Sequence, residues 1–305
     1  MIWLPIVGNY TEIDAYASVI AYADLLNQRQ KPAKTYLLHA PNYSVPNSLR
    51  LPERENSVFD FKPGDQAIIL DISIPEVIHQ IVTDDQILEL IDHHPGFESY
   101  WQEAIGERAI IEPIGAVATS IYEWWGECWD YHKMTSAVAK LLLAAILDNT
   151  LNFNATITTD RDRAAATSLA EIASTTVADF AEWYFSAVSD TVLGDLSGAL
   201  LGDTKKMALP TGGTEFTFGQ LTVWSTEQIL PRVEEIHRIM SEHSKSWLLS
   251  VLDISAGHNY ILTNSEQLTD YFGQLLRLKP TGDAYISDHL LLRKEILRKM
   301  QDYPV

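Results

Sequence analysis

The chain has 305 residues, 46% of them hydrophobic and 21% charged, which exceeds the usual size of one hydrophobic core and predicts two folded domains. Its formal net charge of -19 repels nucleic acids and anionic membranes, which argues against a general DNA- or RNA-binding protein. A single cysteine, Cys128, and the lack of any apolar stretch of ~18 residues predict a cytoplasmic protein with neither membrane nor nucleic-acid partners.

The first half of the sequence alternates short apolar runs with longer segments of helical pattern. The run at residues 2–7 has no basic region before it and meets an acidic residue at Glu12, so we expect a strand there and not a signal peptide. This alternation predicts an α/β domain at residues 1–188, with a doubly wound, mostly parallel sheet covered by helices on both faces. Further strands are expected at 35–39, 66–70, 86–91 and 109–111, and helices at 15–26, from Pro75, and at 115–125, 136–147 and 160–174.

The second half has a different texture, with glycine becoming frequent from about residue 190 onward. Strand-like runs alternate here with two helical patterns. We therefore expect a smaller α+β domain at residues 192–305, with the active site in the cleft between the two domains. The expected strands are 216–223, 247–252 and 260–263, and the expected helices are 231–243 and 288–301.

Acidic and histidine residues gather where the strands of the first domain are expected to end. Because ligands of open parallel sheets bind beyond the carboxyl ends of the strands, these side chains are expected to face one crevice. Carboxylate oxygens suit hard cations such as Mn²⁺ and Mg²⁺, and Mn²⁺ also accepts imidazole. Taken singly, each cluster is more typical of a helix cap or a turn, but together they predict a metal site. The clusters are Glu12-x-Asp14, Asp71, Asp92-His93-His94 and Asp148.

Several of these segments resemble motifs of one enzyme superfamily. Asp92-His93-His94 resembles the signature that names the DHH phosphoesterase superfamily. Residues 13–26, 69–73 and 144–153 resemble the first, second and fourth motifs of the family II, manganese-dependent inorganic pyrophosphatases, and residues 115–120 are similar to the glycine–threonine segment that follows the DHH motif. Residues 203–206 and 292–296 resemble, less strongly, the second domain that these enzymes share with the exopolyphosphatase and prune branch.

The resemblance implies a metal-dependent phosphohydrolase that binds one or two Mn²⁺ ions, or Mg²⁺ or Co²⁺ in their place. In the family, the carboxylate corresponding to Asp71 is shared by two metals and the histidine corresponding to His94 lies beside the substrate, so these two are the expected catalytic residues. The implied metal ligands are Asp14, Asp71, His93 and Asp148, with Glu12 and Asn9 at the family's first metal site. The implied ligands of a small anionic phosphate substrate are His94, Lys205, Arg293 and Lys294.

The first metal site departs from the family pattern. Pyrophosphatases carry a histidine four residues before the first-motif aspartate, where this chain has Asn9 or Gly8, and Glu12 stands in place of that aspartate. The segment is also one residue short. Since a neutral amide oxygen is a weaker ligand than imidazole, we expect one well-formed metal site and one weakened or reshaped site.

Three functional hypotheses follow. The leading one is hydrolysis of a phosphoanhydride, in pyrophosphate or short polyphosphate, by metal-activated water. The second is a catalytically impaired protein of the DHH fold that binds phosphate or metal in a regulatory role. The third is a phosphoesterase that acts on a small organic phosphate or a nucleotide. Pairing of two copies through the first domain, as a homodimer, stays open.

Overall fold

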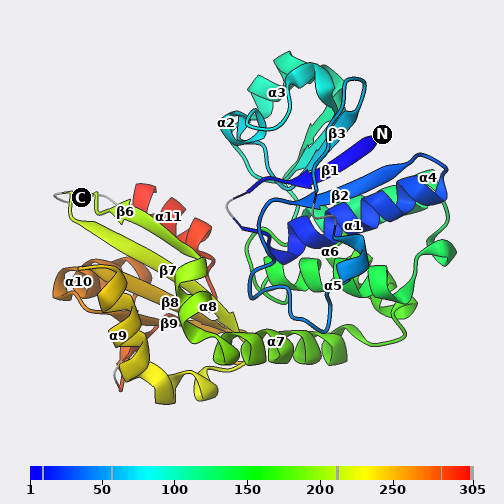
Figure 1. The fold of residues 1–305 in the computed structure, drawn as a ribbon. Helices are drawn as coiled ribbons and strands as arrows, with labels where there is room; N and C mark the ends of the chain where they lie inside the picture. The colour runs from blue at the N-terminus through cyan, green and yellow to red at the C-terminus, as the bar shows by residue number, and fades with distance from the viewer. Residues whose placement is uncertain (9, 56–57, 211–212, 283, 303–305) are drawn as a thin grey trace. The chain divides into compact units, whose positions relative to one another are not determined.

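The computed structural model describes residues 1–8, 10–55, 58–210, 213–282 and 284–302 (Figure 1). The chain divides into two units, Met1–Ala181 (unit 1) and Glu182–Val305 (unit 2). The division falls inside helix α7 (Val177–Gly194), and the boundary expected between residues 188 and 192 lies in the same helix.

Unit 1 is built on a five-stranded sheet in the order β2-β1-β3-β4-β5, in which all neighbouring strands are parallel. Four consecutive residues of β3, from Ala67 to Leu70, are buried, as is typical of a central strand covered on both faces. This sheet confirms the expected α/β class with a parallel sheet. The strands are β1 (Ile2–Ile6), β2 (Ala33–Leu37), β3 (Gln66–Leu70), β4 (Ile87–Asp92) and β5 (Ala109–Ile111).

Helices lie on both faces of this sheet (Figure 1). On one face, α2 (Pro75–Ile78) and α3 (Glu98–Ile105) pack the buried Ile78 and Trp101 against strand residues such as Ile69. As expected, Pro75 is the first residue of α2, a position where its missing N–H is not needed. On the other face lie α1 (Ile13–Gln28), α4 (Val117–Cys128), α5 (Ser136–Asn149) and α6 (Asp160–Ile172). Short 3-10 helices occur at Pro52–Arg54, Asp84–Gln86, Gly106–Arg108 and Tyr131–Lys133.

Unit 2 contains a six-stranded mixed sheet in the order β10-β11-β9-β8-β7-β6, in which only β7 and β8 are parallel. Its core is rich in aromatic residues, with Phe216 and Phe218 of the sheet packed against Phe272 of a covering helix. The strands are β6 (Thr204–Ala208), β7 (Glu215–Val223), β8 (Trp247–Asp253), β9 (His258–Thr263), β10 (Lys279–Thr281) and β11 (Ala284–Ile286). The helices are the rest of α7, α8 (Leu196–Gly202), α9 (Val233–His243), α10 (Glu266–Leu276) and α11 (Arg293–Asp302), with 3-10 helices at Thr226–Gln228 and Leu230–Arg232.

The last helix begins later than the expected residue 288. Asn259 binds both main-chain groups of Leu291, accepting from its N–H at 2.8 Å and donating to its carbonyl at 2.7 Å. A side chain that holds the backbone in this way competes with helical hydrogen bonds, so the chain is not helical until Arg293.

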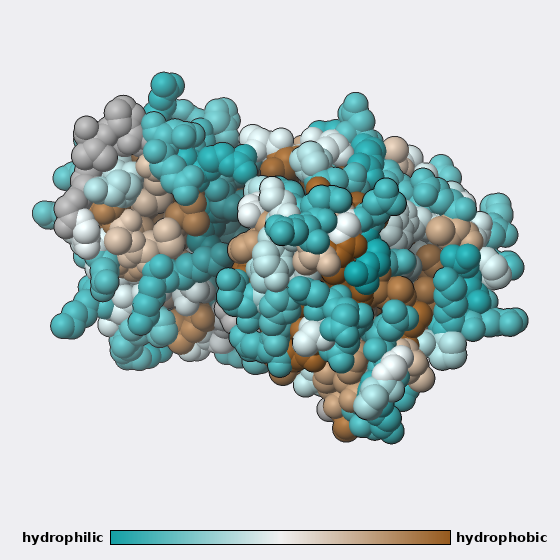
Figure 2. Space-filling model, turned by 90° about the horizontal axis from the view of Figure 1, so that it is seen from above, coloured by the Kyte–Doolittle hydropathy of each residue, from teal (hydrophilic) through white to brown (hydrophobic). Residues whose placement is uncertain are grey.

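The face of the molecule seen in Figure 2 is mainly hydrophilic, and hydrophobic residues appear on it in scattered groups. This agrees with the high proportion of acidic residues in the composition. Across the described residues, none of the helices combines the length and apolarity that crossing a membrane requires.

Candidate metal centre

The ends of β3 and β4 bring acidic and histidine side chains together in unit 1. Asp71 follows the last residue of β3, and Asp92 is the last residue of β4, which pairs in parallel with β3. The Asp71 N–H donates to the Ile91 carbonyl at 2.9 Å, so the two strand ends stay joined at this point. Asp71 has a left-handed backbone with φ of 62°, a conformation that Asp tolerates better than most residues.

Three side chains from these strand ends form a group that could hold one ion. Ligand atoms of Asp71, His93 and His94 all lie within 4.8 Å of one another. Asp71 Oδ1 lies 3.5 Å from His93 Nε2 and 3.9 Å from His94 Nδ1. Asp71 and His93 are buried, whereas the His94 side chain is 44% exposed. We call Asp71, His93 and His94 the triad; its first two side chains are buried and the third can be reached by solvent.

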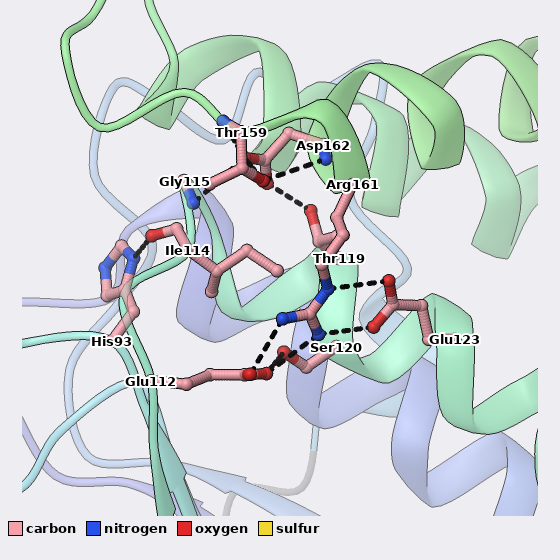
Figure 3. Close-up of polar contacts among 10 residues, drawn as sticks. All are labelled: His93, Glu112, Ile114, Gly115, Thr119, Ser120, Glu123, Thr159, Arg161 and Asp162. Carbon is pink, nitrogen blue, oxygen red and sulfur yellow. Dashed lines mark hydrogen bonds and ion pairs between the residues drawn. The ribbon is translucent and has the colours of Figure 1, made fainter.

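The tautomer of His93 follows from its second ring nitrogen. Nδ1 lies 3.0 Å from the main-chain carbonyl of Ile114, and because a carbonyl can only accept, Nδ1 must carry the proton (Figure 3). Nε2, the other ring nitrogen, lies toward the Asp71 carboxylate and is an acceptor whenever the ring is neutral. These two potential ligand atoms, 3.5 Å apart, suit a cation bound by both, since ligands at right angles on an ion with ~2.1 Å bonds lie about 3 Å apart.

Asp92 organises both histidines of the triad. Its Oδ1 accepts from the His93 N–H at 2.7 Å and lies 2.8 Å from His94 Nδ1. Burial is the largest single influence and raises the pKa of Asp92, but contacts with His94, Ser73 and His93 together lower it by more, so the pKa lies below the usual carboxyl value. Asp92 therefore remains ionised at neutral pH and holds the His94 ring by its Nδ1.

Asp14, an expected metal ligand, has both carboxylate oxygens bound by protein donors. Oδ1 and Oδ2 accept from the Ala118 and Val117 N–H groups at the start of α4, each at 2.9 Å, and Oδ2 also accepts from Asn149 Nδ2 at 2.6 Å. Burial raises the pKa of Asp14 to about 6, although the two main-chain hydrogen bonds lower it. The carboxylate thus serves as a cap for α4.

The structure brings together only part of the expected ligand set. Among the described residues, Asp71, His93 and His94 form the only group of three or more His, Cys, Asp or Glu side chains whose ligand atoms all lie within 4.8 Å of one another. Asp14 and Asp148 are not members of this group. Asp148 lies in the last turn of α5 and Glu12 immediately before α1. Asn9, the remaining expected ligand, lies outside the described residues.

The cationic residues expected to bind substrate differ in exposure. Lys205 on β6 and Lys294 on α11 are exposed and retain that expectation. Arg293 is only 6% exposed, and its guanidinium forms an ion pair with the Asp203 carboxylate and donates to the Asp203 carbonyl at 2.8 Å. In this arrangement the Arg293 guanidinium connects α11 to Asp203, the residue before β6, and its substrate role stays a prediction.

The sequence interpretation missed the groups behind His93, among them a main-chain carbonyl. The Ile114 carbonyl carries no residue-specific signal, and the Gly115 N–H that follows it donates to the buried Asp162 at 3.0 Å. Asp162 was detectable as the fourth residue of the Thr159-x-x-Asp162 pattern, which is similar to a capping box.

Comparisons with known proteins find relatives that match nearly the whole chain. No family model matches the chain. The manganese-dependent inorganic pyrophosphatase of Bacillus subtilis (strain 168) is 26% identical over 303 residues, which covers 96% of this chain and 94% of that protein. The manganese-dependent inorganic pyrophosphatase of Methanothrix thermoacetophila is also 26% identical, over 95% of this chain and 94% of that protein.

Solved structures show the same fold. A Methanococcus jannaschii protein described as a candidate family II inorganic pyrophosphatase superposes with a TM-score of 0.68, at 21% identity and 99% coverage of both chains. An exopolyphosphatase-related protein from Bacteroides fragilis gives a TM-score of 0.50 at 11% identity, over 99% of this chain and 90% of that one. In sequence and in fold, along nearly its whole length, the chain is similar to the manganese-dependent, family II inorganic pyrophosphatases.

Proposed function

We propose that this protein is a divalent-metal-dependent phosphohydrolase that cleaves a phosphoanhydride bond in pyrophosphate or short polyphosphate. The observation that carries the proposal is the group of potential ligand atoms at the ends of β3 and β4, in which His93 Nε2 and Asp71 Oδ1 lie 3.5 Å apart beside His94. The similarity to proteins named manganese-dependent inorganic pyrophosphatases, over 96% of this chain, supports the substrate class.

Asp71 and His93 would hold the ion, and the mixture of carboxylate and imidazole donors favours Mn²⁺ or Co²⁺ over Mg²⁺. A bound ion of this kind lowers the pKa of water and neutralises charge on a phosphoryl group. His94 lies beside this pair, partly exposed, and Asp92 engages its Nδ1, which leaves Nε2 to contact a phosphate oxygen. The exposed Lys205 and Lys294 are proposed to bind the anionic substrate.

The reaction adds one water across the phosphoanhydride. The water oxygen forms a new bond to phosphorus, the bridging P–O bond breaks, and its electron pair leaves with the second phosphate. The water loses a proton, which ends on a product phosphate or in solvent. Because both products are anions, catalysis depends mainly on positioning and on charge stabilisation.

Release of inorganic phosphate from a panel of substrates tests the proposal. Metal-stripped protein would be supplied with Mn²⁺, Co²⁺ or Mg²⁺ and with pyrophosphate, tripolyphosphate or a longer chain, beside a nucleotide and a sugar phosphate. We expect release from the anhydrides with Mn²⁺ and loss of release in the His93→Gln protein. No release from any anhydride with any of the three ions would reject the proposal.

A second candidate, a metal- and phosphate-binding protein without turnover, is favoured by the contacts of Asp14. Its carboxylate is held by main-chain groups of α4 and does not complete the triad, and Glu12 replaces the family's aspartate. Calorimetry that shows pyrophosphate binding in the presence of Mn²⁺, with no product over hours, would identify this case. Gain of turnover in an Asn9→His, Glu12→Asp double variant would then trace the loss to the altered first site.

A further inference from the structure

The first turn of α6 is attached to the segment that supports His93. Three consecutive charged residues, Arg161, Asp162 and Arg163, each bind a different part of unit 1. Figure 3 shows the first two of them directed at the segment between β5 and α4. Asp162 is the buried member of the three, with no exposed surface.

We propose that Asp162 is a positioning residue of the metal centre, which acts on His93 through the single peptide group that joins Ile114 to Gly115. This inference rests on the proposed function, in which His93 is a metal ligand. Its structural content, a carboxylate that fixes the orientation and tautomer of the histidine, can be tested without turnover.

The peptide group between Ile114 and Gly115 is held from both sides. Its N–H donates to Asp162 Oδ2 at 3.0 Å, and its carbonyl accepts from His93 Nδ1 at 3.0 Å. The described chain contains no cis peptide bond, so the N–H and carbonyl point in opposite directions across one plane. A carboxylate that accepts from the N–H polarises the amide and makes its carbonyl a better acceptor. In many metal sites a carboxylate accepts directly from the second ring nitrogen of a ligating histidine and so fixes its tautomer and orientation. Asp162 has the same effect on His93, but it acts through one peptide group.

The contacts of Asp162 exceed what a helix cap requires. Capping of α6 uses its Oδ2, which accepts from the Thr159 N–H and hydroxyl, both at 2.7 Å. The same Oδ2 reaches Gly115, 47 residues away, and Oδ1 accepts from the Thr119 hydroxyl on α4 at 2.6 Å, 43 residues away. One carboxylate therefore fixes three segments that meet behind His93.

Packing at Gly115 shows how closely the peptide is confined. A Cβ added there would lie 2.6 Å from Asp162 Oδ2 and 2.6 Å from Cγ2 of Thr150, which follows the end of α5. Contacts this short force a shift, so only glycine lets the peptide lie between the two side chains. Gly115→Ala would disturb the same arrangement, because the new Cβ would clash with the Asp162 carboxylate directly.

The neighbouring Arg161 offers a matched control. It pairs with Glu112 at 2.7 Å and with Glu123 at 2.5 Å, and its side chain is 44% exposed. These contacts involve Glu112 and Glu123 and leave the Ile114–Gly115 peptide untouched. Arg161→Gln should therefore behave as the wild type in every test of His93.

Nitrogen-15 NMR of the metal-free protein reads the tautomer directly, with the His93 signals assigned by their absence in His93→Gln. The wild type should show His93 protonated at Nδ1, and Asp162→Ala should lose that preference and bind Mn²⁺ about 10- to 100-fold more weakly by calorimetry. Asp162→Asn keeps an oxygen for the Gly115 N–H. This variant should keep the proton of His93 at Nδ1 and bind Mn²⁺ within about threefold of the wild type. Thr135→Ala removes the cap of α5 and serves as a second control for general loss of stability.

Two results would overturn the inference. The first is a folded Asp162→Ala protein whose His93 tautomer and Mn²⁺ affinity match the wild type. The second is a wild-type His93 that carries its proton at Nε2 and not at Nδ1, which needs no variant and so decides the matter even if Asp162→Ala fails to fold. Failure of the wild type to bind Mn²⁺ at all would instead reject the proposed function, and the tautomer would still report on the positioning role.

Discussion

Arg293 and Asp203 form a buried ion pair that joins the first residue of α11 to the residue before β6. The Arg293 guanidinium also donates to the main-chain carbonyls of Asp203, at 2.8 Å, and Phe218, at 3.3 Å. An arginine expected to bind substrate is therefore part of the framework of unit 2.

We expect Arg293→Met to destabilise the protein strongly, because it leaves the Asp203 carboxylate buried without its cation. Losing one partner of a buried pair typically costs about 3–5 kcal/mol. Urea unfolding would measure it, with Arg238→Met as the control, since the Arg238–Glu242 pair is exposed and its loss should change stability by less than about 1 kcal/mol. Unchanged stability together with lost phosphate release would instead assign Arg293 to the substrate.

The two histidines of the triad should separate in their effects. His93→Gln removes the buried Nε2, the proposed metal-ligating nitrogen, and should weaken Mn²⁺ binding by at least about 100-fold. His94→Gln should keep the Mn²⁺ affinity within about tenfold and lower phosphate release. Calorimetry and the release assay, run on the same preparations, measure the two quantities. The exposed His132→Gln is the control, and equal loss of Mn²⁺ affinity in both triad variants would contradict the assignment.

Binding of Mn²⁺ should raise the melting temperature of the wild type. An ion that binds only the folded protein contributes about 2.7 kcal/mol at a concentration 100 times its Kd. Thermal unfolding followed with and without Mn²⁺, then after a chelator, gives the shift and its reversal. The same shift in His93→Gln would show that the ion binds at another place.

Stability should depend on pH through Glu55. The Arg50 guanidinium binds this carboxylate at 2.6 and 3.1 Å and Tyr16 donates to it at 2.8 Å, which lowers the pKa of Glu55 below its usual value. A lowered pKa means that the stabilisation is present above the unfolded value of 4.5 and is lost as the pH falls through the folded value. Glu55→Gln should therefore melt lower than the wild type at pH 7, by about 5 °C, and the difference should shrink below pH 4.

The neighbouring Glu53 is exposed and supplies the matched control for this pH series. Glu53→Gln should melt within about 1 °C of the wild type at every pH, as expected for a surface substitution. If the gap between Glu55→Gln and the wild type stayed constant from pH 7 to pH 3, its origin would be packing and not charge.

The parallel sheet of unit 1 could be predicted because its strands carry continuous apolar runs, as in β3, which burial on both faces requires. The edge strand β6 lacked such a signal, since its sequence TKKMA is polar and half exposed. Helix α10 was overlooked although Leu268, Phe272 and Leu276 recur at a helical spacing. Within unit 2, β6 was therefore missed because it lacks an apolar pattern, whereas α10 was missed although its sequence carries one.

At the candidate site, the sequence predicted the residues that strand ends bring together, Asp71 with His93 and His94. It could not reveal that main-chain N–H groups of α4 hold Asp14, or that the Ile114 carbonyl sets the tautomer of His93. Main-chain donors and acceptors are the same at every residue, so their use depends on the fold and leaves no trace in residue identity.

The left-handed backbone of Asp71 limits which replacements can probe this carboxylate. Asparagine adopts that conformation readily and removes only the negative charge, whereas alanine adds backbone strain and a β-branched residue adds more. A comparison of Asp71→Asn with Asp71→Ala therefore separates electrostatics from main-chain geometry. The same restriction narrows the routes by which this position could evolve toward another ion, since nearly every alternative donor side chain would have to tolerate a positive φ.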